Sequence, residues 1–148
     1  MYWLGFLGES AEAGELDWQA IGGTWGVATS RVTDWVRDKS IRFPAELDRA
    51  IDAISVAHPR NGRTLSHYVA KYFEDMYHHF HAVHPLMKAG GRLHYIIGNS
   101  LFYGIPVASD RIYEHMLRKA GVEKVKSRII RKRNSKRELF EYDVSAEA

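Results

Sequence analysis

The stretch that decides the fold is Gly90-Gly91-Arg92-Leu93-His94-Tyr95-Ile96-Ile97-Gly98-Asn99-Ser100. Its centre, residues 93–97, is short, β-branched and aromatic, which predicts a strand covered on both faces. Gly98, Asn99 and Ser100 follow at the position where open α/β sheets bind ligands, just beyond the carboxyl end of a strand. The sequence therefore predicts a buried strand that brings small polar groups to the edge of a sheet.

Helical patterns flank this strand on both sides. Before it, Thr64 or Ser66 is expected to cap a helix that Pro85 ends. After it, Ser109 is expected to cap a second helix that stops at Gly121. The first helix has one apolar stripe at helical spacing, made of Val69, Tyr72, Phe73, Met76, Phe80 and Val83. The predicted unit is helix, strand, helix.

The last part of the chain predicts a closing antiparallel hairpin. Residues 122–131 alternate in part, and residues 138–144 place Phe140, Tyr142 and Val144 on one face. Turn residues lie between the two runs, in Arg133-Asn134-Ser135-Lys136.

The front of the chain is less regular. Residues 1–30 carry six glycines that interrupt any period, whereas Pro44 suits the first position of a helix with Leu47, Ile51 and Ile54 on its inner side. Turn residues 58–63 then mark a boundary. We therefore expect a helical or irregular segment over residues 1–63, which is a possible target-recognition region, and an α/β unit over residues 64–148.

Composition limits the class of protein. The chain has 148 residues, a formal net charge of +3 and no cysteine, which excludes disulfides and thiolate chemistry and fits a reducing compartment. It has no apolar run near the roughly 20 residues that span a bilayer, and its start lacks the charged region of a signal peptide. These features predict a soluble cytoplasmic protein without a membrane partner.

The order of these pieces resembles the C-terminal half of a class I S-adenosylmethionine-dependent methyltransferase, specifically a DNA amino-methyltransferase. The resemblance implies a partial Rossmann-like sheet, from its fifth strand onward, with a closing antiparallel hairpin. It is carried by His84-Pro85-Leu86-Met87-Lys88-Ala89-Gly90-Gly91, Tyr95-Ile96-Ile97-Gly98-Asn99-Ser100, Gly104-Ile105-Pro106-Val107, Ser127-Arg128-Ile129-Ile130-Arg131 and Lys136-Arg137-Glu138-Leu139-Phe140-Glu141-Tyr142.

The resemblance implies an enzyme that transfers a methyl group to the exocyclic amino group of adenine or cytosine in DNA, as in restriction-modification. In such enzymes the cofactor loop, the acid that holds the ribose and the Asp/Asn-Pro-Pro-Tyr motif lie upstream, and none occurs in these 148 residues. We therefore expect no catalytic or cofactor-binding residue here, Met1 as an internal methionine or a truncation point, and an inactive chain on its own. S-adenosylmethionine is expected to bind only together with an N-terminal half or a complementing chain.

The end of the predicted strand supplies candidates for the substrate pocket. Asn99 and Ser100 suit hydrogen bonding, and Phe102 and Tyr103 suit stacking on a base pulled out of its helix. The alternative is that Asn99 and Ser100 merely turn the chain and that the two aromatic side chains pack under the sheet.

Basic residues in the predicted hairpin are candidates for phosphate contacts. The alternative is a solvated edge, since edge strands commonly carry Lys and Arg. A second candidate surface combines Trp18, Trp25 and Trp35 with Arg31 and Arg37. The hairpin candidates are Arg128, Arg131, Lys132, Arg133, Lys136 and Arg137.

Glu74, His78 and His81 share one helix face, but that face is also where solvated residues belong, so no metal site is expected.

Two alternative functions stay open. One is a non-catalytic module that binds DNA or RNA. The other is an RNA methyltransferase, which is closely related to the DNA methyltransferase hypothesis.

Overall fold

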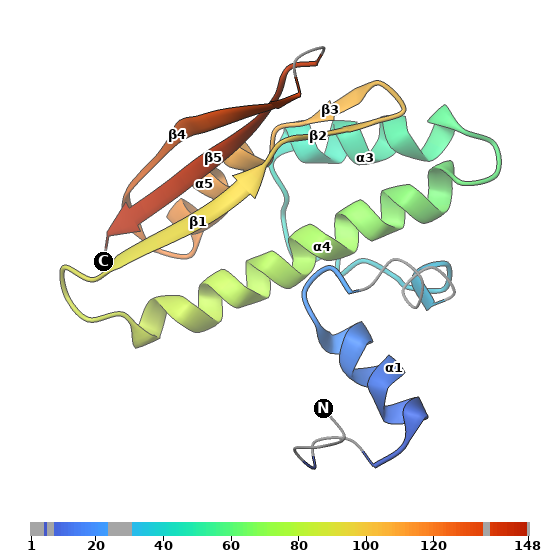
Figure 1. The fold of residues 1–148 in the computed structure, drawn as a ribbon, viewed down its shortest axis with the longest axis horizontal. Helices are drawn as coiled ribbons and strands as arrows, with labels where there is room; N and C mark the ends of the chain where they lie inside the picture. Colours follow the sequence, from blue (N-terminus) through green and yellow to red (C-terminus); the bar gives the residue numbers. More distant parts are fainter. Residues whose placement is uncertain (1–4, 6–7, 24–30, 135–136, 148) are drawn as a thin grey trace.

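The computed structural model describes residues 5, 8–23, 31–134 and 137–147, and these form a mixed α/β structure (Figure 1). None of the helices in these ranges has the length and apolar character needed to cross a membrane. In chain order the elements are α1 (Ser10–Gln19), α3 (Ala45–Ala57), α4 (Gly62–Val83), the 3-10 turn η2 (His84–Leu86), β1 (Arg92–Gly98), β2 (Ser100–Phe102), β3 (Ile105–Val107), α5 (Ser109–Lys119), β4 (Glu123–Asn134) and β5 (Leu139–Glu147).

The main sheet has three strands in the order β1-β5-β4, and both pairings are antiparallel. The closing hairpin of β4 and β5 is therefore confirmed. Since β5 runs opposite to both neighbours, β1 and β4 run in the same direction with β5 between them. The parallel pairing of a Rossmann-like sheet is not found among the described strands, so the fold expectation is confirmed only as mixed α/β.

Strand β1 is covered on one face only, and the prediction of a strand buried on both faces was wrong. Its exposure alternates: Tyr95 contacts Phe80 of α4 and Tyr113 of α5, whereas His94 and Ile96 lie on the open face. A short apolar run does not reveal whether helices cover one face or two. Here α4 and α5 both pack on the same side, and Ile96 is 59% exposed on the other.

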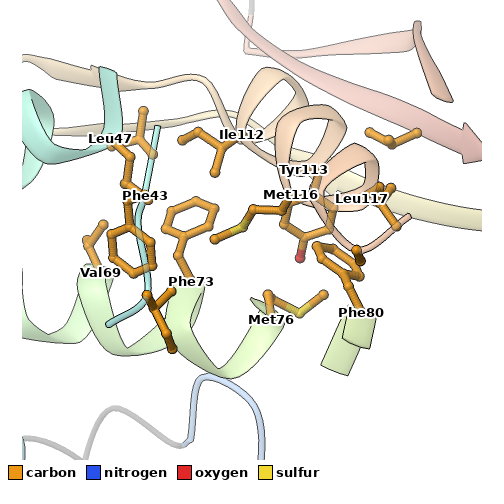
Figure 2. Packing of buried hydrophobic residues seen from close by; sticks show 14 of the residues in the cluster. Phe43, Leu47, Val69, Phe73, Met76, Phe80, Ile112, Tyr113, Met116 and Leu117 are labelled. Carbon is orange, nitrogen blue, oxygen red and sulfur yellow. The ribbon is translucent and has the colours of Figure 1, made fainter. Parts of the chain in front are cut away.

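The core lies between α4, α5 and the covered face of the sheet (Figure 2). From α4, Phe73 and Phe80 are almost fully buried, and from α5 Tyr113 and Leu117 meet them. Leu47 of α3 closes one end of this cluster. The apolar stripe predicted for α4 is thus confirmed in its central members, each fully buried side chain contributing about 1.5–3 kcal/mol of transfer free energy.

Helix boundaries follow local chemistry with small corrections. Helix α4 begins at Gly62, so the predicted caps Thr64 and Ser66 were wrong, and the Ser66 hydroxyl instead donates to the Arg63 carbonyl at 2.8 Å. Gly62 lies in close contact with the end of α3, because a Cβ at this position would lie 2.5 Å from the carbonyl oxygen of Ser55. Helix α5 has Ala108 at its N-cap position and begins at Ser109, so the predicted cap Ser109 was wrong. The helix ends before Gly121, whose φ of +92° suits glycine, as predicted.

One helix and two strands were not predicted from the sequence. Helix α1 lies in the glycine-rich front, where no regular period is visible. Strands β2 and β3 form a hairpin whose turn residues, Tyr103 and Gly104, both have positive φ (51° and 84°), and this hairpin packs on α3 (Figure 1). Tyr-Gly is not the usual sequence of such a turn, for which Asn-Gly is the strongest signal.

Candidate functional site

Asn99 joins the carboxyl end of β1 to the start of β5. Its side-chain Nδ2 donates to the carbonyl of Glu138 at 2.9 Å, and its Oδ1 accepts from the backbone N–H of Phe140 at 2.7 Å. Both ends of the amide are therefore used by backbone groups that come from 39 and 41 residues further along the chain. Asn99 fixes the hairpin against the strand end.

Arg133 strengthens the same junction. Its guanidinium donates to the Phe140 carbonyl at 3.2 Å and to the Asn99 carbonyl. The guanidinium lies directly over Gly98, where a Cβ would come within 2.4 Å of its central carbon. Glycine at position 98 leaves space for the Arg133 guanidinium. Arg133, a predicted phosphate contact, is therefore hydrogen-bonded within the protein.

Replacing Asn99 with Ala is expected to lower the free energy of unfolding by about 1–2 kcal/mol, because the Phe140 N–H and the Glu138 carbonyl lose their partner. Urea denaturation measures the change. Asn61→Ala is the matched control, since the Asn61 side chain makes no capping bond at the start of α4. Equal stability of both variants would contradict the junction described above.

A cavity of about 300 Å³ lies beside this junction, at the carboxyl end of β1. Ser100 and Phe102, both named from the sequence, line it. Aromatic side chains of α4 form the facing wall, and the size is at the lower end for small-molecule pockets. The lining residues are Tyr68, Val69, Tyr72, Phe73, Ile96, Ile97, Gly98, Ser100, Phe102, Val107 and Ser109.

Tyr72 supplies a hydroxyl group in this largely aromatic wall. Its hydroxyl is hydrogen-bonded to the hydroxyl of Tyr113, and burial raises the pKa of both phenols above the ordinary value of about 10. Both groups therefore stay neutral at physiological pH. Tyr72 was assigned to the core stripe from its spacing alone, which carries no sign of a cavity.

A second cavity, of about 470 Å³, lies on the other side of Val107 and is lined by Asn99, Glu138 and Phe140. Its wall is more polar, since Asp110 and Arg111 of α5 also face it. Asn99 thus lines this second cavity, whereas Ser100 and Phe102 line the first.

Tyr103 lines neither cavity. It lies at the tip of the β2–β3 hairpin, 46% exposed, with its ring stacked on His58 at 5.2 Å between centroids. The structure therefore brings Ser100 and Phe102 together and separates them from Asn99 and Tyr103.

Three basic residues of the hairpin form ion pairs with acids on β5 or just before it. Arg128 pairs with Asp143 at 3.1 Å, and a hydrogen bond from His94 to the same carboxylate, followed by that from Arg128, holds the pKa of Asp143 below its ordinary value. Likewise, Arg131 pairs with Glu141 at 2.6 Å and Lys132 with Glu138 at 2.9 Å. Arg137 is exposed in the turn, and Lys136 lies outside the described residues.

The tryptophan surface forms in part. Trp18 is in contact with two cations, with Arg31 at 4.9 Å and Lys71 at 4.7 Å from its ring centre. Trp35 instead packs edge-on against His67 at 6.2 Å. The remaining members do not join: Arg37 pairs with Asp48 at 2.6 Å and covers the ring of Phe43, and Trp25 lies outside the described residues.

Two predicted residues on the polar face of α4, Glu74 and His81, are hydrogen-bonded to backbone groups. Glu74 accepts a hydrogen bond from the backbone N–H of Asp38 at 2.9 Å, and His81 donates from Nδ1 to the Tyr77 carbonyl at 2.8 Å. Across the described ranges, no three His, Asp or Glu side chains converge in a way that could hold a metal ion.

Comparison with known proteins finds no matching family model, no matching curated protein and no matching solved structure.

Proposed function

We propose that this chain forms the C-terminal part of the catalytic domain of a DNA amino-methyltransferase. In this proposal it supplies one wall of the pocket for the target base. A further polypeptide segment supplies the S-adenosylmethionine site and the residues that hold the amino group in line with the methyl group.

The arrangement of the sheet supports a role as one part of a larger domain. Strand β1 pairs with β5 along one edge, and among the described strands its other edge has no partner. The strand is connected to the similarly directed β4 through α5. A parallel sheet with helices on both faces is built from such crossovers, so the open edge and the open face of β1 suit a further strand and helix.

The cavity beside β1 is the observation that carries the proposal. Methyl transfer from a sulfonium depends mainly on placing the amino nitrogen in line, with the base drawn from its stack into a pocket. Phe102 and Tyr72 present aromatic surface for such a base, and Ser100 and the neutral Tyr72 hydroxyl present hydrogen-bonding groups. The cavity lies beyond the carboxyl end of a strand, where open α/β sheets bind ligands.

The proposal is tested on the native assembly, purified from source cells through a tag on this chain. Incubation with unmethylated DNA and S-adenosylmethionine labelled in its methyl group is expected to place label in DNA, and Phe102→Ala is expected to lower the rate at least tenfold at unchanged assembly. Leu86→Ala is the matched control, since Leu86 is 80% exposed and lines neither cavity. An assembly that binds DNA without transferring label contradicts the proposal.

The isolated chain is expected to bind S-adenosylmethionine weakly or not at all. A cofactor of this size needs several converging polar groups, and the sequence has neither the glycine loop nor the ribose-holding acid. Calorimetric titration measures the affinity, and a micromolar dissociation constant for the isolated chain is the contradicting result.

A non-catalytic nucleic-acid-binding module is the second candidate. It is favoured by the grouping of the Trp18 ring with the cations of Arg31 and Lys71, because aromatic and basic side chains together are typical of single-strand binding surfaces. The labelling experiment separates the two functions, because this module binds nucleic acid without any methyl transfer. Running it with RNA as well tests the RNA methyltransferase alternative.

A further inference from the structure

An exposed tyrosine, Tyr103, occupies the turn of the β2–β3 hairpin with a backbone conformation that Asn and Gly adopt more readily. Tyr103 has a φ of 51° and Gly104 a φ of 84°, and a turn with both angles positive prefers Asn or Gly at its first position. Backbone strain of this kind persists where the surroundings enforce it, and an observed outlier motivates a search for a role. The turn places an aromatic ring at the outer end of the hairpin, 46% exposed.

His58 holds this ring in one orientation. The two rings stack at 5.2 Å with an interplanar angle of 13°. The imidazole is itself fixed, because its Nδ1 accepts hydrogen bonds from the backbone N–H groups of Arg60 (3.3 Å) and Asn61 (3.2 Å). The Tyr103–His58 pair is therefore a preorganised aromatic surface and not a freely rotating side chain.

The support beneath the pair is rigid. Gly62 packs against the end of α3 so closely that a Cβ would lie 2.5 Å from the carbonyl oxygen of Ser55, which fixes the turn that carries His58. Arg60 and Arg63 are exposed in and directly after this turn. An aromatic surface next to guanidinium groups is the combination that binds single-stranded nucleic acid, bases on the ring and phosphates on the cations.

We propose that the Tyr103–His58 pair is a stacking site for an unpaired DNA base, separate from the cavity beside β1, with Arg60 neutralising a neighbouring phosphate. It rests on the proposed function for the choice of DNA, and adds to it a contact outside the pocket of the target base. An enzyme that unstacks a base creates unpaired neighbours, and a rigid exposed ring stabilises one of them.

The test measures binding of a fluorescein-labelled single-stranded oligonucleotide of mixed sequence to the chain by fluorescence anisotropy at low salt. Tyr103→Asn is the decisive variant, because Asn is favoured in this turn and the melting temperature is expected to stay equal or rise. Binding is expected to weaken about tenfold, the usual effect of losing one stacked base. Tyr103→Trp, which keeps an aromatic ring, is expected to retain binding.

Leu86→Ala is the control, since Leu86 is 80% exposed and follows the far end of α4, and its loss is expected to leave binding unchanged. Equal binding by Tyr103→Asn and the unaltered chain overturns the proposal, as does a chain that binds no single strand. If Tyr103→Asn weakens binding to a blunt-ended duplex as much as binding to the single strand, the ring does not stack on an unpaired base and the proposal is overturned. If the native assembly transfers no methyl group but single-strand binding still depends on Tyr103, only the proposed function is overturned.

Discussion

Phe80→Ala is expected to lower the free energy of unfolding by about 3–5 kcal/mol, the usual cost of removing a fully buried phenylalanine. Phe80 of α4 is 1% exposed, and its ring centroid lies 5.2 Å from that of Tyr95 of β1 and 5.1 Å from that of Tyr113 of α5. Figure 2 shows Phe80 beside Tyr113. Both ring contacts are edge-on. Alanine at position 80 therefore leaves a cavity between the rings of Tyr95 and Tyr113.

Thermal unfolding followed by circular dichroism measures this effect, with an expected fall in melting temperature of about 10 °C for a chain of this length. Leu86→Ala is the control, because Leu86 is 80% exposed after the same helix and its truncation is expected to cost less than 0.5 kcal/mol, roughly the range of surface substitutions. Similar losses for the two variants contradict the core described here.

Gly62→Ala is expected to cost about 3 kcal/mol. The added Cβ would lie 2.5 Å from the carbonyl oxygen of Ser55 and 2.8 Å from that of Ile54, and both are backbone atoms that no rotamer change can move away. Helices α3 and α4 must therefore separate at their junction, which also shifts the turn that carries His58. The midpoint of urea denaturation measures the loss.

Gly90→Ala provides the comparison for this prediction. Gly90 has a φ of +72° and no atom within 4 Å of an added Cβ, so its replacement costs only the conformational penalty of about 1–2 kcal/mol. A Gly62→Ala variant as stable as Gly90→Ala would show that the helix junction has room to adjust.

Patterns that are local in sequence predicted the elements well. The stripe of α4 was visible because five turns repeat the same spacing, and the hairpin of β4 and β5 because both strands alternate around turn residues. Helix α1 and the β2–β3 hairpin were missed, since one lies among glycines and the other turns at Tyr103-Gly104, a sequence without a common turn signal.

Relations between distant residues could not be predicted in the same way. The basic residues of the hairpin were predicted as phosphate contacts or a solvated edge, and their ion pairs were not predicted. The acids Glu138, Glu141 and Asp143 become their neighbours only after the two strands of the hairpin pair. Asn99 was placed correctly at the strand end, but its bonds to Glu138 and Phe140 span about forty residues. The wall of the cavity was likewise not predicted, because Tyr72 belongs to the same apolar stripe of α4 as the buried Phe73.

The central claim, that the cavity beside β1 receives a nucleobase, is tested most directly by titrating adenosine and cytidine at millimolar concentration into the isotope-labelled chain and following its backbone amide signals. The account predicts that at least one nucleoside shifts the signals of Gly98, Ser100 and Phe102 together with those of Tyr72 and Ser109, which border the same cavity. Shifts confined to other parts of the chain, or no shifts at all, would contradict it.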